Sequence, residues 1–325
     1  MNKLIRPRLG RWSAQGLPTD DRHVVICIHG ILSDSSTFVN FLRHVDALDR
    51  DGQLDFWLFD YDYRQPIAQS ADQLADAIKS RAYGARRVDL IGHSMGGLVA
   101  RLAILRNRLP HVQRVVTLAT PNHGTISGAQ LNLLGQMTSL SLRQLHPIYP
   151  RAAGIFDLTD IHRIMRDALE EMYRRDPTRL DGKSYVSIPA QYYHYHRQYG
   201  EELPSTMMRG VSVFRKALNF LPGYQVRLNP VHDGIVEERS NRIHPAPAGS
   251  SDEGKYMPSR SDAAERILHA THLAGADCDH VTITSNPEIA DLVHALLRAK
   301  CFSAEAIDPW LAGPPGRVEL WPPVP

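Results

Sequence analysis

The sequence has few cysteines and no long apolar run. Its 325 residues include three cysteines, Cys27, Cys278 and Cys301, an odd number without the spacing of metal ligands. This pattern argues against a disulfide scaffold, although it allows one bridge, and it favours a reducing compartment. No stretch approaches the ~18 consecutive apolar residues that a membrane-spanning helix needs. A transmembrane protein is therefore excluded as an interpretation of the printed sequence.

An excess of charge of either sign is also missing. The 37 Lys and Arg residues nearly balance the 35 Asp and Glu residues, which leaves a formal net charge of +2 without long blocks of like charge. Nucleic acids and acidic membranes attract proteins through concentrated positive charge. Electrostatics therefore favours neither partner, and we expect no nucleic-acid binding.

Residues 1–16 lack the features of a secretory signal. They carry four basic side chains but no apolar run of roughly 7–15 residues. A basic, acid-free start also fits a transit peptide, but these residues hold only one serine, and transit peptides are rich in serine. We therefore expect a cytoplasmic location, with an organelle as the less favoured alternative.

From His23 to about Ala119, short β-branched runs alternate with segments of helical period. This pattern predicts an α/β fold, a mostly parallel sheet covered by helices on both faces. Such sheets carry their chemistry in the loops at the carboxyl edge. The expected strands are 24–28, 55–59, 88–91 and 112–118, and the expected helices are 38–48, a segment after Pro66, and 98–105.

The alternation stops after Pro121. Residues 125–183 and 191–228 have helical apolar periodicity and predict two insertions that form a cap or lid on a single domain, 1–325. Core packing explains the same apolar stripes equally well. Further strands are expected at 185–188 and 267–270 and a helix at 287–300, whereas the Pro-rich tail from Asp308 is expected to be irregular.

Gly92-His93-Ser94-Met95-Gly96 matches the pattern G-x-S-x-G. Alone this pattern is weak, because a chain of this length contains one by chance roughly one time in ten. Here it lies between a predicted strand and a predicted helix, which is the context in which its serine is a nucleophile on a sharp turn. The sequence therefore predicts Ser94 as a catalytic nucleophile rather than part of a surface turn.

Acyl transfer also needs hydrogen-bond donors for the oxyanion that develops in the transition state. The backbone amide of Met95 directly follows the nucleophile at a helix N-terminus. A second amide is expected from Ile31, after His29-Gly30 at the end of the first predicted strand, although His-Gly is also an ordinary turn. We predict these two amides as the oxyanion hole.

Around this kind of serine the acid follows the nucleophile in the chain and precedes the base. Asp233 occupies a turn before an apolar run, which predicts it as the acid. The histidines after it are His244, His269, His272, His280 and His294. His280 is favoured as the base over His272, because it lies on a loop between the last predicted strand and the C-terminal helix.

With these blocks in order, the sequence resembles the α/β-hydrolase lipases and esterases, in particular small bacterial triacylglycerol lipases and esterases similar to GPI inositol-deacylases. The resemblance spans about residues 24–297. The shared blocks are His29-Gly30-Ile31, Gly92-His93-Ser94-Met95-Gly96-Gly97, Leu118-Ala119-Thr120-Pro121-Asn122-His123-Gly124, Asp233-Gly234-Ile235-Val236 and His280-Val281.

The resemblance implies hydrolysis of carboxylic esters, from small molecules or lipids, through an acyl-enzyme intermediate. The resemblance implies no cofactor. If the insertions 125–183 and 191–228 form a cap, the resemblance implies that this cap makes a peripheral contact with membranes. Two alternatives use the same fold: an acyltransferase with the same three residues, and a binding module without catalysis.

Two departures from the family pattern stand out. Ser33-Asp34 replaces the second glycine of a His-Gly-x-x-Gly loop, and the short segment before the first predicted strand implies that early antiparallel strands are missing. His194-Tyr195-His196 lacks a third ligand at a suitable spacing, so we predict a solvated loop there and no metal site.

Overall fold

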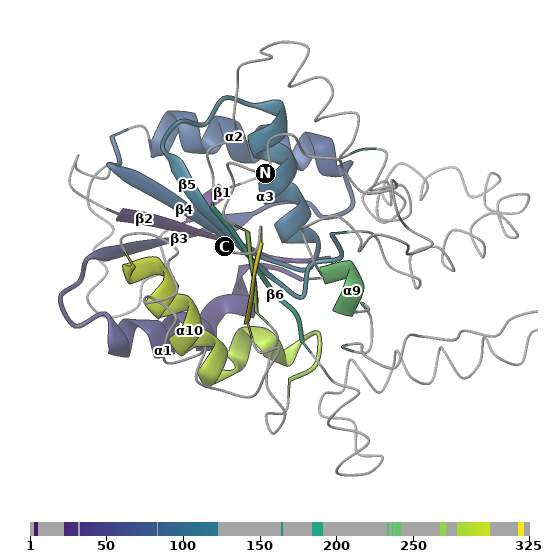
Figure 1. The fold of residues 1–325 in the computed structure, drawn as a ribbon. Coiled ribbons are helices and arrows are strands. Elements are labelled where there is room, and N and C mark those ends of the chain that lie inside the picture. Colours follow the sequence, from purple (N-terminus) through teal and green to yellow (C-terminus); the bar gives the residue numbers. More distant parts are fainter. Residues whose placement is uncertain are drawn as a thin grey trace, which may run out of the picture.

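The computed structural model describes the parts of the chain that form a central sheet and its covering helices (Figure 1). Both predicted cap insertions, 125–183 and 191–228, lie outside the described residues apart from Ile164. The described residues are 3–5, 23–31, 33–82, 84–122, 164, 184–190, 233, 236, 238–241, 267–270, 278–299 and 318–321.

One eight-stranded sheet runs through the described residues in the order β1-β3-β2-β4-β5-β6-β7-β8. The six inner strands run parallel to one another, and β1 and β8 at the two edges pair antiparallel with β3 and β7. The predicted, mostly parallel α/β sheet is therefore confirmed. The strands are β1 (Lys3–Ile5), β2 (His23–Ile28), β3 (Leu54–Asp60), β4 (Arg87–His93), β5 (Val112–Leu118), β6 (Ser184–Ile188), β7 (Ile267–Ala270) and β8 (Val318–Trp321).

Both edge strands contradict the sequence analysis. β1 is an early antiparallel strand where none was expected, and β8 lies in the tail that was expected to be irregular. At three and four residues they are too short for an alternating pattern to stand out from their Pro- and Arg-rich surroundings. Their pairing with β3 and β7 is a long-range contact that local periodicity does not report.

Helices cover both faces of the sheet, as predicted (Figure 1). On one face α2 (Ile67–Arg81) and α3 (Met95–Arg106) bury their apolar side chains with those of β2 and β4. On the other face α1 (Val39–Leu48) and α10 (Pro287–Arg298) form the second core with β2, β3, β5 and β6. The short elements η1 (Ser35–Phe38), α9 (Glu238–Asn241) and η4 (Thr282–Ser285) complete the described helical segments. None of these helices is long and apolar enough to cross a membrane.

The register of the sheet aligns the carboxyl ends of the central strands. Ile28 of β2 pairs with Gly92 of β4, and Leu118 of β5 pairs with both His93 of β4 and Ile188 of β6. In a parallel sheet, residues that follow aligned strand ends emerge at the same edge. The loops after β2, β4 and β5 therefore meet at one edge of the sheet.

Candidate active site

Ser94 forms the sharp turn between β4 and α3. Its backbone adopts φ 53° and ψ −127°, a left-handed conformation that a residue with a side chain rarely takes and that costs about 1–3 kcal/mol. Two backbone hydrogen bonds hold the turn: Ser94 N–H donates to the Leu118 carbonyl at 2.9 Å, and Gly97 N–H donates to the Ser94 carbonyl at 3.1 Å. This geometry is the strand–turn–helix that the G-x-S-x-G pattern predicts.

The glycines around Ser94 let α3 approach the sheet closely. A Cβ at Gly96 would overlap the carbonyl oxygens of Ile28 and His29 at the end of β2. A Cβ at Gly92 would overlap the backbone of Gly97. These glycines therefore serve close packing between the backbone of α3 and the strand ends.

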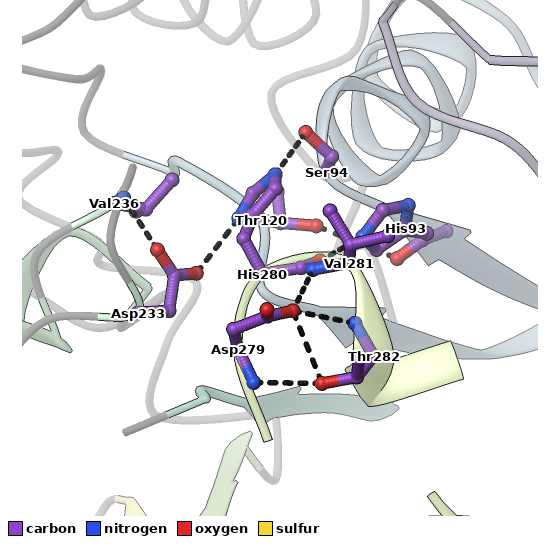
Figure 2. A network of polar contacts seen from close by, with 10 residues as sticks. His93, Ser94, Thr120, Asp233, Val236, Asp279, His280, Val281 and Thr282 are labelled. Carbon is purple, nitrogen blue, oxygen red and sulfur yellow. Dashed lines mark hydrogen bonds and ion pairs between the residues drawn. The ribbon is translucent and has the colours of Figure 1, made fainter. Parts of the chain in front are cut away.

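Ser94, His280 and Asp233 form a hydrogen-bonded chain (Figure 2). His280 Nε2 lies 2.9 Å from Ser94 Oγ, and His280 Nδ1 lies 2.7 Å from Asp233 Oδ2. The other oxygen of the carboxylate, Asp233 Oδ1, accepts the backbone N–H of Val236 at 2.6 Å. The structure thus brings together the three side chains that the sequence analysis selected.

Burial and hydrogen bonding determine which atoms donate protons along the hydrogen bonds between Ser94, His280 and Asp233. Relative to full exposure, Ser94 is 5% exposed, His280 4% and Asp233 0%. An ionised carboxylate is only an acceptor, so the proton of the imidazole sits on Nδ1 and is donated to Asp233. Nε2 then has a lone pair with which it accepts the hydroxyl proton of Ser94. The arrangement can therefore remove a proton from Ser94.

The loop that carries His280 is organised by Asp279. Its Oδ1 accepts the backbone N–H groups of Val281 and Thr282, each at 2.7 Å, and the Thr282 hydroxyl at 3.0 Å. In return, Thr282 Oγ1 accepts the Asp279 N–H at 2.8 Å. These reciprocal hydrogen bonds form a turn directly before η4 and fix the backbone on the C-terminal side of His280. The sequence analysis missed Asp279, although an Asp whose side chain accepts the N–H of the residue two positions later is a common turn signal.

His93, the residue before Ser94, contacts the same loop. His93 Nε2 lies 2.7 Å from the His280 carbonyl oxygen, and the two rings lie 5.2 Å apart between centroids. Burial lowers the pKa of His93 to about 3, with a smaller contribution from the nearby His280. His93 is therefore neutral at physiological pH. Sequence reasoning used this position only as the variable x of G-x-S-x-G.

The loop after β2 lies against the serine turn. A Cβ at Gly30 would lie 2.7 Å from Ser94 Cβ, so only glycine fits there without displacement. His29 Nδ1 is 2.9 Å from the Gly30 carbonyl oxygen, and the His29 ring stacks on Tyr61 at 4.4 Å between centroids. The Tyr61 hydroxyl donates to the His29 carbonyl at 2.9 Å. These contacts organise the segment that leads to Ile31.

Both predicted oxyanion amides belong to residues at this edge. Met95 is the first residue of α3 and is buried, which puts its amide at the N-terminus of that helix beside Ser94. Ile31 is partly buried against the core that α2 and α3 share. Their role as oxyanion donors stays a prediction.

The block Thr120-Pro121-Asn122, which follows β5, contacts both α3 and α9. A Cβ at Gly97 would overlap the side chain of Thr120. Asn122 Oδ1 accepts Arg101 Nη1 of α3 at 2.8 Å, and Asn122 Nδ2 donates to the Asn241 carbonyl of α9 at 2.7 Å. The sequence analysis used this block only as a mark of the family.

The competing histidines lie elsewhere. His269 is in β7 and His294 is in α10, whereas His244 and His272 lie outside the described residues. Within the described ranges, no group of three or more His, Cys, Asp or Glu side chains is arranged to hold a metal ion. Cys27 and Cys278 are buried free thiols; Cys301 and the segment His194-Tyr195-His196 lie outside those ranges.

Comparisons with known proteins agree with this architecture. Residues 30–141, about a third of the chain, match the family model described as PGAP1-like alpha/beta domain. No curated protein matches the chain.

Two similar solved structures are bacterial. The mature lipase BlEst2 of Bacillus licheniformis is 16% identical, with a TM-score of 0.51 over 91% of this chain and 98% of the lipase chain. Phospholipase PlaB of Legionella pneumophila is 15% identical, with a TM-score of 0.51 over 89% of this chain. The match covers 61% of the PlaB chain, so this chain spans about three fifths of that phospholipase.

At such identities the likeness establishes the fold, and it confirms the resemblance predicted from the sequence. The match to the PGAP1-like model covers the serine turn and the loop after β2. The chain therefore has the α/β-hydrolase fold, and its residues 30–141 are similar to the PGAP1-like alpha/beta domain.

Proposed function

We propose that this protein hydrolyses carboxylic esters by nucleophilic catalysis, with Ser94 as nucleophile, His280 as general base and Asp233 as the residue that orients His280. The observation that carries the proposal is the chain of hydrogen bonds from Ser94 Oγ through both ring nitrogens of His280 to Asp233, at 2.9 and 2.7 Å. A nucleophile within reach of a base that is itself oriented by an acid is the signature of this chemistry.

The reaction begins when Ser94 Oγ attacks the carbonyl carbon of the ester and its proton passes to His280 Nε2. Asp233 stabilises the imidazolium that forms. The tetrahedral intermediate then expels the alcohol, which takes the proton from His280, and an acyl-enzyme remains. Water next attacks the acyl carbon while His280 accepts its proton, and the carboxylic acid leaves as Ser94 regains a proton.

The negative oxygen of each tetrahedral intermediate needs donors that are already in position. We assign this role to the amides of Met95 and Ile31, because Met95 follows Ser94 and begins α3, and Ile31 follows Gly30, which lies against Ser94. Loss of one such donor typically costs roughly 2.7–4 kcal/mol of transition-state stabilisation.

Replacement of the nucleophile tests the proposal. We expect Ser94→Ala to fold normally and to lose turnover of p-nitrophenyl butyrate by about 10⁶-fold in kcat, down to background. A fluorophosphonate probe should label the wild-type protein on the peptide that contains Ser94 and should not label the variant. Ser70→Ala is a matched control, because Ser70 is buried in α2 and its hydroxyl has no hydrogen-bond partner among the described residues. Turnover that persists in Ser94→Ala contradicts the proposal, and a wild-type protein that neither labels nor turns over an ester panel is a binding module.

We further propose that the substrates carry an acyl chain. The support is the apolar periodicity of residues 125–183 and 191–228, which predicts a helical cap above the edge of the sheet where Ser94 lies. A cap of this kind predicts higher kcat/KM on dispersed esters with acyl chains of eight or more carbons than on soluble acetates. A preference for acetates across a graded series of p-nitrophenyl esters would contradict it.

A further inference from the structure

We propose that His93 is a positioning residue that holds the backbone of His280 and so sets the separation between the Ser94 hydroxyl and the imidazole. The inference rests on the proposed function, because it assigns His93 a task only if His280 accepts the proton of Ser94. Three observations carry it: a direct bond between the two segments, the complete bonding of the His280 backbone, and the protonation state that this bond requires.

The bond joins two segments that are far apart in the sequence. His93 ends β4 and directly precedes Ser94, whereas His280 lies 187 residues later on the loop before α10. His93 Nε2 lies 2.7 Å from the His280 carbonyl oxygen (Figure 2). Because a carbonyl oxygen only accepts, the Nε2–H of His93 is the donor. The residue beside the nucleophile therefore ties down the residue that carries the base.

The rest of the His280 backbone is held as well. Its N–H donates to the Asp233 carbonyl at 3.1 Å, and the Asp279 carboxylate fixes the next two amides, those of Val281 and Thr282. His93 holds the one remaining backbone group of His280, the carbonyl. Without that bond the carbonyl is buried and unsatisfied, and the peptide can rotate to find another donor. Such a rotation moves the Cα of His280 and with it the imidazole.

The protonation state of His93 fits this task. Its Nδ1 is buried and has no hydrogen-bond partner among the described residues, as expected for a neutral ring with its proton on Nε2. The titratable groups near its ring are His280, Asp233 and His29. A cation on His93 would lie 5.2 Å from the imidazolium that forms on His280 during the reaction and would oppose it. Burial prevents this by lowering the pKa of His93.

Three variants of His93 distinguish a positioning role through its hydrogen bond from a role in which its side chain only fills space. His93→Leu keeps bulk but removes the donor, and we expect kcat to fall about 10- to 100-fold with KM within about threefold, as for a displaced catalytic group. His93→Gln places an amide N–H near the position of Nε2 and should restore kcat to within about fivefold of wild type. His93→Asn is one methylene shorter, reaches only the position of Nδ1, and should be as slow as His93→Leu.

His23→Leu is the matched control. His23 is also a buried histidine at the end of a central strand, but it begins β2 at the opposite edge of the sheet and bonds to Asp89 at 2.8 Å. We expect this variant to lower the melting temperature and to leave kcat unchanged. The comparison shows whether loss of any buried histidine bond slows turnover.

A proton NMR measurement makes the outcome independent of turnover. The downfield resonance of the His280 Nδ1–H that is shared with Asp233 should be sharp in wild type and His93→Gln, and shifted or broadened in His93→Leu and His93→Asn. Equal kcat and an equal resonance in all three His93 variants would overturn the inference, even if wild type is an active esterase. If His93→Leu fails to fold, equal behaviour of the Gln and Asn variants overturns it. The wild-type protein could be inactive while the His280 Nδ1–H resonance is still sharp with a donor at residue 93 and altered without one. That result would refute the proposed function but not the positioning role of His93.

Discussion

Both oxygens of the Asp233 carboxylate accept a hydrogen bond, so the orientation of the carboxylate is fixed from two sides. Oδ1 accepts the Val236 N–H at 2.6 Å, and Oδ2 accepts the His280 Nδ1–H at 2.7 Å. An amide side chain at this position has one oxygen and one NH₂ group, so it cannot accept at both places. The backbone N–H of Val236 therefore decides how such a side chain would orient.

We expect Asp233→Asn to lower kcat by about 10⁴-fold with little change in fold. The amide oxygen would face Val236, so its NH₂ group would face His280 and force the ring proton onto Nε2. Nε2 could then no longer accept the proton of Ser94. Steady-state kinetics on a p-nitrophenyl ester measures this, with Asp72→Asn, a half-buried residue of α2, as the control for an equal change in charge. A loss of less than tenfold would speak against Asp233 as the orienting acid.

At the scale of elements, the turn between β4 and α3 depends on how closely the helix approaches β2. Gly96 faces the carbonyl oxygens of Ile28 and His29, and the start of α3 leaves no space there for a methyl group. The atoms in the way are backbone atoms of a buried central strand, so they cannot move aside as a flexible side chain can. Close packing of the helix start and the strained turn at Ser94 are therefore parts of one local arrangement.

Gly96→Ala should lower the free energy of unfolding by about 1–3 kcal/mol or more, through overpacking against the end of β2. Because the methyl group displaces α3, we also expect kcat to fall more than stability alone explains. Urea denaturation and kinetics at a temperature where the variant stays folded measure the two effects. Gly52→Asn is the control: Gly52 has φ +63°, which asparagine tolerates, and no atom lies within 4 Å of a Cβ there. Wild-type behaviour of Gly96→Ala would contradict the packing argument.

At the scale of the whole molecule, burial of histidines affects how stability depends on pH. Burial lowers the pKa of His93 to about 3 and also lowers the pKa of His29. In the unfolded chain both groups return to about 6.5, so below that pH the unfolded state binds more protons at these two histidines than the folded state does. Their contribution therefore makes stability fall as the pH drops below about 6.5.

We expect the free energy of unfolding to decrease between pH 6.5 and 4.5 with a slope of up to about 1.4 kcal/mol per pH unit for each fully neutral buried histidine. Urea denaturation at four pH values in this interval measures the slope. His93→Gln removes one such group. The slope of the free energy of unfolding against pH should therefore be smaller in this variant, by up to about 1.4 kcal/mol per pH unit. An equal slope in the variant would indicate that His93 does not resist protonation in the folded state.

Local pattern in the sequence was sufficient for the inner elements. The buried strands β2, β4 and β5 follow from short runs rich in β-branched and apolar residues, and the apolar stripes of α1, α2 and α10 follow from a period of 3.6 residues. Neighbouring residues establish both patterns by themselves. The strand–turn–helix around Ser94 is predictable for the same reason, because the whole motif spans a few consecutive residues. The predicted helix 98–105 was shorter than α3, because Met95 to Gly97 after the turn already belong to the helix and it continues to Arg106.

Only the tertiary structure decided which distant groups meet. Ser94 and His280 are 186 residues apart, and Asp233 and His280 are 47 apart; chain order and loop position selected them, but their 2.9 and 2.7 Å contacts depend on the register of the central strands. The edge strands β1 and β8 and the bond from His93 to the His280 carbonyl left no local signal. The physical reason is that hydrophobic periodicity records which face of an element is buried, whereas hydrogen-bond partners across the fold are chosen when the sheet assembles.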